Sequence, residues 1–102
     1  GGHMKKIQKL VDQIDEEICG AKEYAEMYIE QKVKGNSTWA NRFKENANDE
    51  IKHAMMMHDY AVMEIEELKK VFKAPAEMQE AWDKSHTEYV ERVAWVKQML
   101  TM

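Results

Sequence analysis

The chain has 102 residues, of which 19 are acidic and 15 are basic, and its formal net charge at pH 7 is -4. This length suits one domain with one modest hydrophobic core and is too short for two domains that each bury their own core. The charges are spread along the chain without a long basic run, so we expect no nucleic-acid partner. One proline, four glycines and abundant Glu, Lys, Met and Ala predict an all-α fold.

The first four residues, Gly-Gly-His-Met, are typical of a tag-cleavage scar followed by a start methionine at Met4. We therefore set residues 1–4 aside and take residues 5–102 as a single helical domain. Cys19 is the only cysteine, cannot form an internal disulfide, and is expected to be a small buried residue. The sequence has no signal-peptide pattern and no apolar run of 18 residues, which predicts a cytoplasmic protein without membrane association.

The first expected helix covers about residues 5–34. Its apolar or small positions advance by three and four residues, as one face of a helix requires. They are Ile7, Leu10, Ile14, Ala21, Tyr24 and Tyr28. Between Ile14 and Ala21 the series requires an apolar residue at position 17, but the residue there is the charged Glu17. Gly35 is expected to end the helix in a left-handed C-cap, and Asn36 or Ser37 to cap the next helix.

The second expected helix covers about residues 38–72 and carries its own inner stripe. The apolar members of that stripe are Trp39, Phe43, Ala47, Ala54, Met57, Ala61, Leu68 and Phe72. Glu50 and His53 belong to the same stripe. Both expected helices of this hairpin thus place polar side chains on their inner faces.

The third expected helix covers about residues 75–101. Pro75 suits its first turn, where the missing N–H of proline costs nothing. Its apolar stripe consists of Met78, Trp82, Tyr89, Val93, Val96 and Leu100. Three helices joined by short turns predict an antiparallel three-helix bundle.

The polar inner positions require a partner, because an unpaired ionised carboxylate in an apolar core costs many kcal/mol. Measured from a turn near residue 35, Glu17 stands at a height of ~28 Å, and the segment from Glu50 to His53 at ~22 to 26 Å, for a rise of ~1.5 Å per residue. The three side chains are therefore expected to meet across the hairpin. Small residues nearby would leave room for an ion, and a carboxylate and imidazole set suits iron, manganese or zinc.

An alternative interpretation needs no metal. In it, Glu17 and Glu50 lie at a solvent-exposed edge of the stripe and His53 is a hydrogen-bonded core histidine. Met55, Met56 and Met57 could suggest copper, but consecutive residues point to different sides of a helix, and core filling explains them better.

Other polar residues are excluded from this site by their position. His58 follows His53 by five residues and so lies on another face of the helix. His86, in an Asp-x-x-His pattern of the third helix, differs from His53 by ~13 Å in height, too far for a shared ion.

Residues 16–54 resemble the ferritin-like superfamily, and within it the rubrerythrin-type helical hairpin. The resemblance rests on Glu17, Tyr24, Gly35, Phe43 and the segment "ANDEIKHA", residues 47–54. Ferritin-like di-iron bundles take one Glu from each of two helices and a Glu-x-x-His from each of the other two. This chain contains half of that set. The third helix does not resemble the second hairpin of the family.

The resemblance implies that a second copy of the chain supplies the missing ligands, as in the similar encapsulated ferritins, whose centre forms at a dimer interface. A homodimer or higher homo-oligomer would then hold two iron ions, with manganese or zinc as alternatives. Glu17 and Glu50 would act as terminal or bridging ligands, and His53 as a terminal ligand. Tyr24 and Tyr28, on the same face, are candidate second-shell residues, although both also fit an aromatic core.

The function implied by the resemblance is ferritin-like metal binding with ferroxidase or peroxide-scavenging activity. The alternative is a non-catalytic helical interaction protein that keeps the hairpin and has no functional metal site. The sequence alone does not decide whether the protein is an enzyme, since a fold family implies a site more than a reaction.

Overall fold

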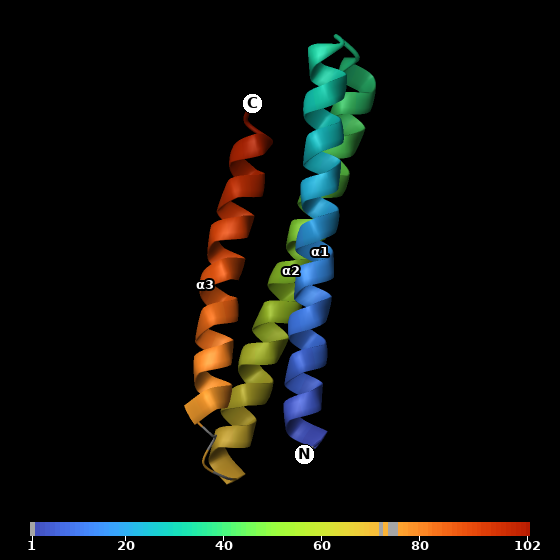
Figure 1. Cartoon of the computed structure of the whole chain (residues 1–102). Helices are drawn as coiled ribbons and strands as arrows, with labels where there is room; N and C mark the ends of the chain where they lie inside the picture. Colours follow the sequence, from blue (N-terminus) through green and yellow to red (C-terminus); the bar gives the residue numbers. More distant parts are fainter. Residues whose placement is uncertain (1, 72, 74–75) are drawn as a thin grey trace.

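The structure, a computed structural model, describes residues 2–71, 73 and 76–102. Every regular element in this part of the chain is a helix: α1 (Gly2–Val33), α2 (Ser37–Val71) and α3 (Ala76–Met99). The three helices lie side by side in an elongated bundle with extents of 56 × 17 × 16 Å (Figure 1). The prediction of an all-α helical bundle is confirmed. Phe72 and Pro75, for which we predicted places in the second and third helices, lie outside the described residues.

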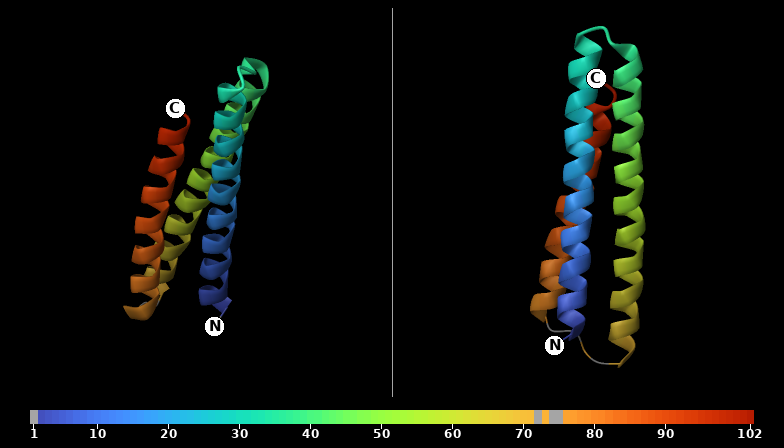
Figure 2. Two further views of the ribbon diagram at one scale, coloured as in Figure 1. Left: turned by 45° about the horizontal axis from the view of Figure 1, so that its top comes forward. Right: turned by 90° about the vertical axis from the view of Figure 1, so that its right-hand side faces the viewer.

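Gly35 closes the turn between α1 and α2. Its φ angle is 78°, a left-handed conformation that glycine adopts without strain. The Gly35 amide donates to the Lys32 carbonyl at 3.0 Å and the Asn36 amide donates to the Gln31 carbonyl at 2.9 Å, which are the two bonds of a Schellman motif. The Asn36 carbonyl then accepts the first bond of α2, from the Ala40 amide at 3.0 Å. Asn36 is therefore the N-cap residue of α2, and α2 returns along α1 (Figure 2).

The contacts between α1 and α2 run in reverse order along the two helices. Ile7 at the start of α1 shares a core cluster with Ile65 near the end of α2. Close to the turn, the rings of Tyr24 and Phe43 stack with centroids 6.3 Å apart. In the middle of the hairpin the facing residues are small, and fully buried alanines let the two backbones approach. These alanines are Ala21, Ala25, Ala47 and Ala54.

α3 packs along one side of this hairpin and completes the main core. Val93 and Val96 of α3 belong to the same buried cluster as Ile14 and Ile18 of α1. At the edge of that cluster the Arg92 guanidinium donates to the Asp15 carboxylate at 2.8 Å and ties α3 to α1. α3 is shorter than the other two helices, and its end stops short of the α1–α2 turn (Figures 1 and 2).

The buried set differs from the predicted stripes in two ways. Ile18 and Ile51 are almost fully buried although they lie outside the predicted stripes, because each hairpin helix must cover a strip wide enough to face two neighbours. Trp39 was predicted to face inward but is 46% exposed. It shares a stripe of α2 with Glu50 and His53, which follow it by 11 and 14 residues. Within the described residues, no helix combines the length and apolarity needed to cross a membrane.

Candidate metal centre

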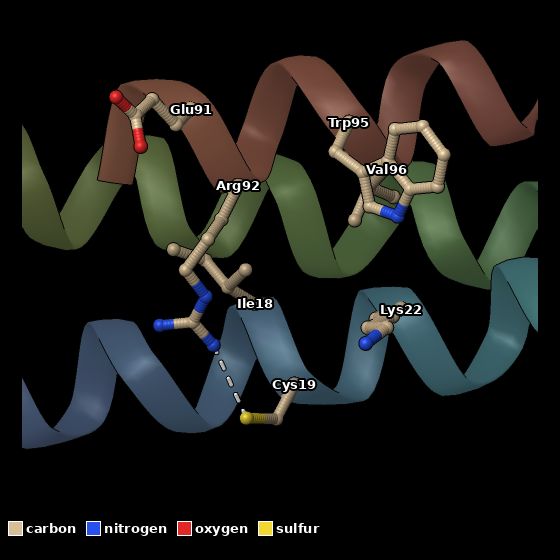
Figure 3. A pocket seen from close by; sticks show the side chains of 7 residues that line it. All are labelled: Ile18, Cys19, Lys22, Glu91, Arg92, Trp95 and Val96. Carbon is tan, nitrogen blue, oxygen red and sulfur yellow. Dashed lines mark hydrogen bonds between the residues drawn. The ribbon is translucent and has the colours of Figure 1, made fainter. Parts of the chain in front are cut away.

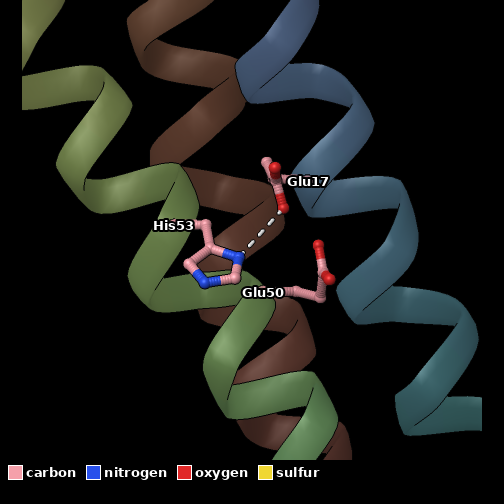
Figure 4. Close-up of side chains that lie close together, drawn as sticks. All are labelled: Glu17, Glu50 and His53. Atoms are coloured by element: carbon pink, nitrogen blue, oxygen red, sulfur yellow. Dashed lines mark ion pairs between the residues drawn. The ribbon is translucent and has the colours of Figure 1, made fainter.

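Glu17 of α1 and Glu50 and His53 of α2 come together halfway along the hairpin (Figure 4). Each side chain offers one ligand atom, and these atoms all lie within 4.8 Å of one another. Glu50 and His53 are one turn apart, so their side chains project from the same face of α2. Glu17 reaches them from the opposite helix, at the height that the spacing of the hairpin predicts.

An ion pair joins the two helices at this point. Nδ1 of His53 lies 3.4 Å from Oε2 of Glu17 (Figure 4). The imidazole thus presents Nδ1 toward the carboxylates and has Nε2 on the other side of the ring.

The second carboxylate, Glu50, interacts directly with Glu17. A hydrogen bond with Glu17 raises the pKa of Glu50 to about 6, and burial and the nearby negative charge of Glu17 act in the same direction. His53 opposes this shift because a positive imidazole would favour the ionised carboxylate. Two carboxylates this close favour a proton or a metal cation between them.

Gly20, one turn after Glu17, gives the Glu50 side chain its space. A Cβ atom at position 20 would lie 3.2 Å from Oε2 of Glu50 and 3.5 Å from its Cδ. Contacts of that length are tight, so any larger residue would press on the carboxylate. The glycine therefore forms part of the wall of the cluster.

The cluster lies at the edge of the core and not inside it. Both carboxylates are partly buried, and the side chains of His53 and Glu17 are 55% and 32% exposed. Among the described residues, no polar or charged residue is fully buried. The cluster opens on the face of the hairpin opposite α3, which passes behind it in Figure 4.

The donor set fits a divalent transition metal. Ligand atoms around one ion lie ~3 to 4.3 Å apart when metal–ligand distances are ~2.0 to 2.2 Å. The observed limit of 4.8 Å is slightly wider, and the exposed His53 ring has the freedom to close the difference. Three protein ligands from one chain leave coordination positions free for water, substrate or a second chain.

The two tyrosines suggested as second-shell residues are placed differently. Tyr28 is buried, and its hydroxyl accepts a hydrogen bond from Nζ of Lys32 at 3.3 Å, away from the carboxylates. Tyr24 lies two turns from Glu17 on the same side of α1 and stacks on Phe43. The contacts of Tyr24 and Tyr28 are those of core aromatic residues, and a role at the metal site stays a prediction.

Cys19 differs from its expected environment. It is exposed, and Nη2 of Arg92 donates to its Sγ atom at 3.2 Å. The pair lines a groove of about 320 Å³ between α1 and α3, next to the half-exposed Trp95 (Figure 3). The prediction of a buried thiol fails because position 19 lies on the flank of α1, about 100° around the helix from the buried Ile18.

The structure also contains a pair of histidines that the sequence analysis did not connect. Nε2 of His58 and Nδ1 of His86 are 2.8 Å apart, across the contact between α2 and α3. Each histidine has an unremarkable local pattern, and only the register of α3 against α2 brings them together. The spacing of Trp82, His86 and Tyr89, four and three residues apart, is the sequence signal that all three share one face of α3.

In comparisons with known proteins, no protein-family model, no curated protein and no solved structure gives a significant match to the chain.

Proposed function

We propose that Glu17, Glu50 and His53 are half of a di-iron carboxylate centre that a second copy of the chain completes. The observation that carries this proposal is the convergence of two carboxylates and one imidazole, from two helices, within 4.8 Å. Together with the ferritin-like pattern of residues 16–54, this convergence favours a ferritin-like metal-binding protein.

The raised pKa of Glu50 supports the ion. Glu50 lies beside the negative charge of Glu17 at a partly buried position, which disfavours ionisation of Glu50. A divalent cation held by both carboxylates would stabilise their charged forms. Iron and manganese suit this mixture of oxygen and nitrogen ligands, and zinc is a further candidate.

The position of the cluster supports a second chain. The cluster lies on two stripes of exposed or partly buried residues, one on each hairpin helix, with a spacing of three and four residues. On α1 the stripe is Gln13, Glu17, Gly20, Tyr24, Met27 and Gln31, and on α2 it is Trp39, Phe43, Asn46, Glu50, His53, Met57 and Tyr60. Two such faces, packed around a two-fold axis, would make a four-helix arrangement with the cluster and its symmetry mate at the centre.

Exposed apolar residues on this face would be buried in such an interface. Trp39 is 46% exposed and Tyr60 is 42% exposed, one on each side of the cluster along α2. A second chain packed on this face would cover both rings together with the cluster between them. The same face without a partner would leave the cluster open to bulk water.

The chemistry that follows is oxidation of ferrous iron by dioxygen or peroxide, either as ferroxidase activity or as scavenging of reactive oxygen species. Two adjacent ferrous ions can supply two electrons to such an oxidant. In this chain the roles of the residues are simple. Glu17 and Glu50 would neutralise the charge of the ions, and His53 would hold one ion through Nδ1.

An anaerobic titration with Fe(II), followed by sedimentation, tests the proposal. Wild-type protein is expected to bind about one Fe(II) per chain and to sediment as a dimer or an assembly of dimers. Glu17→Gln should lose the iron, whereas Glu16→Gln, the same change at the neighbouring exposed position, should keep it. Equal iron binding by both variants would contradict the assignment of Glu17 as a ligand.

The second candidate function, a non-catalytic interaction protein, is favoured by one observation. The ion pair of His53 with Glu17 and the hydrogen bond of Glu50 with Glu17 give all three groups a partner without any metal. In that case Glu17→Leu should stabilise the fold at neutral pH, and the dimer should persist in the presence of a chelator with no bound metal. Loss of the dimer on metal removal would argue against it.

A further inference from the structure

On the side of the hairpin opposite the Glu17 cluster, two histidines join α2 to α3. Nε2 of His58 and Nδ1 of His86 are 2.8 Å apart. Two nitrogen ligands of one ion at metal distances of ~2.0 to 2.1 Å lie ~3 Å apart, so this pair already has nearly the spacing of two adjacent ligands. We propose that His58 and His86 form a second metal site, for Zn(II) or an ion of similar preference, which fastens α3 to α2.

The ring of His58 is held in a fixed orientation by aromatic neighbours from α3. The Tyr89 ring stacks on it with centroids 4.6 Å apart and planes 7° from parallel, and the Trp82 ring stacks with centroids 5.5 Å apart. The side chain of His58 is only 15% exposed. A ligand that is already oriented loses little conformational freedom when it binds an ion.

The second ring nitrogen of His58 has its own partner. Oδ1 of Asp59 lies 3.7 Å from Nδ1 of His58. A carboxylate near one imidazole nitrogen favours a proton there and makes the other nitrogen, Nε2, the acceptor of the hydrogen bond from Nδ1 of His86, so an ion held by the pair would take the place of that shared proton.

The two proposed sites differ in ligand chemistry and in place. The pair at His58 offers two imidazoles, a set that suits zinc, copper or nickel, whereas two carboxylates at the Glu17 cluster suit iron or manganese. His58 follows His53 by five residues, which places it about 140° around α2. His86 is exposed, so water can occupy the remaining coordination positions of an ion held there.

Zinc titration of a variant without the first site tests this proposal independently of the di-iron centre. The background carries Glu17→Gln, and His3→Ala to remove the imidazole near the N-terminus. Calorimetry should show about one Zn(II) per chain, and circular dichroism should show the Tm rising by about 5 °C at zinc saturation. Adding His86→Gln should abolish both effects, whereas Glu16→Gln, a change at an exposed residue outside both sites, should leave both intact.

A conservative exchange separates ligation from a structural role of the histidine pair. His86→Cys should restore zinc binding, because a thiolate is a zinc ligand, although it cannot reproduce the bond between the two rings. Zinc binding and a Tm rise that survive His86→Gln would overturn the proposal. So would the absence of zinc binding by the background variant at millimolar zinc.

Discussion

Gly20 and Glu50 touch across the hairpin so closely that a Cβ atom at position 20 would lie 3.2 Å from the Glu50 carboxylate. Glycine inside a helix destabilises it by about 1 kcal/mol relative to alanine. This loss of stability at position 20 is explained if the space that the glycine leaves has a use. The space is occupied by the carboxylate that faces Glu17. The cluster therefore includes a backbone position as well as three side chains.

Gly20→Ala should raise the free energy of unfolding of the metal-free protein by about 0.5 to 1 kcal/mol, because the flexible end of Glu50 can move aside while the helix gains propensity. The same movement takes Glu50 away from Glu17, so metal affinity should fall. Urea unfolding with a chelator and an iron titration measure the two effects. A variant with lower stability and unchanged metal affinity would show that Gly20 serves packing alone.

Glu50→Gln tests the electrostatic part of the cluster. In the metal-free protein, folding raises the pKa of Glu50 from 4.5 to about 6. A carboxyl group with a higher pKa in the folded state stabilises the fold fully below its unfolded pKa, and this stabilisation is lost as the pH rises through the folded pKa. Glu50→Gln removes the negative charge that is unfavourable in the folded state at high pH. The variant should therefore be more stable than wild type by about 1 kcal/mol near pH 7.5, after allowance for solvent screening.

The stability difference between Glu50→Gln and wild type should vanish near pH 4, where the carboxyl group is largely protonated in both states. Urea unfolding at the two pH values, with a chelator present, gives the comparison. Glu16→Gln, at an exposed neighbour of Glu17, is the control and should show no such pH-dependent gain. A Glu50→Gln protein that is less stable than wild type near pH 7.5 would contradict the account.

Substitutions at Ile18 and Trp39 should have effects opposite to those that the predicted stripes imply, because the stripes include Trp39 and omit Ile18. Ile18 is 1% exposed and packs in the cluster shared with α3, so Ile18→Ala should lower the free energy of unfolding by about 2 to 4 kcal/mol. Trp39 is half exposed, and Trp39→Ala should cost the dilute, metal-free chain less than about 1 kcal/mol. Chemical unfolding with a chelator measures both. Similar losses for the two variants would show that Trp39 is buried in solution.

Cys19 should react with a thiol reagent in the native protein, because it is exposed beside Arg92. Labelling with a disulfide reagent that releases a coloured product should detect about one reactive thiol per chain without denaturant. Cys19→Ala should change the free energy of unfolding by less than about 0.5 kcal/mol, as expected for an exposed side chain. Labelling that requires denaturant would restore the original prediction of a buried thiol.

The hairpin and the proximity of Glu17, Glu50 and His53 could be predicted because they depend on local rules. The Gly35 turn fixes the register of α1 against α2, and counting residues from that turn is enough to bring Glu17 to the level of Glu50 and His53. The rise of a helix is nearly constant, so heights on two helices joined by a tight turn follow from the sequence alone. The structure places all three side chains together as this count predicts.

The surroundings of α3 could not be predicted in the same way. Its register against α2 depends on the packing of side chains from both helices, which a single sequence pattern does not fix. The pairing of His58 with His86 follows from that register, and the bond of Arg92 to Cys19 follows from the register of α3 against α1. Residue type alone also misplaced Cys19, since a small apolar residue suits an exposed flank as well as a core.

Native mass spectrometry of protein produced with supplemented iron tests the shared di-iron centre in one experiment, because one spectrum gives the number of chains and the mass of bound metal. We expect a dimer, or an assembly of dimers, with about two iron ions per pair of chains. Glu50→Gln from the same preparation should lack that mass. A metal-free wild-type protein, whatever its number of chains, would contradict the di-iron centre.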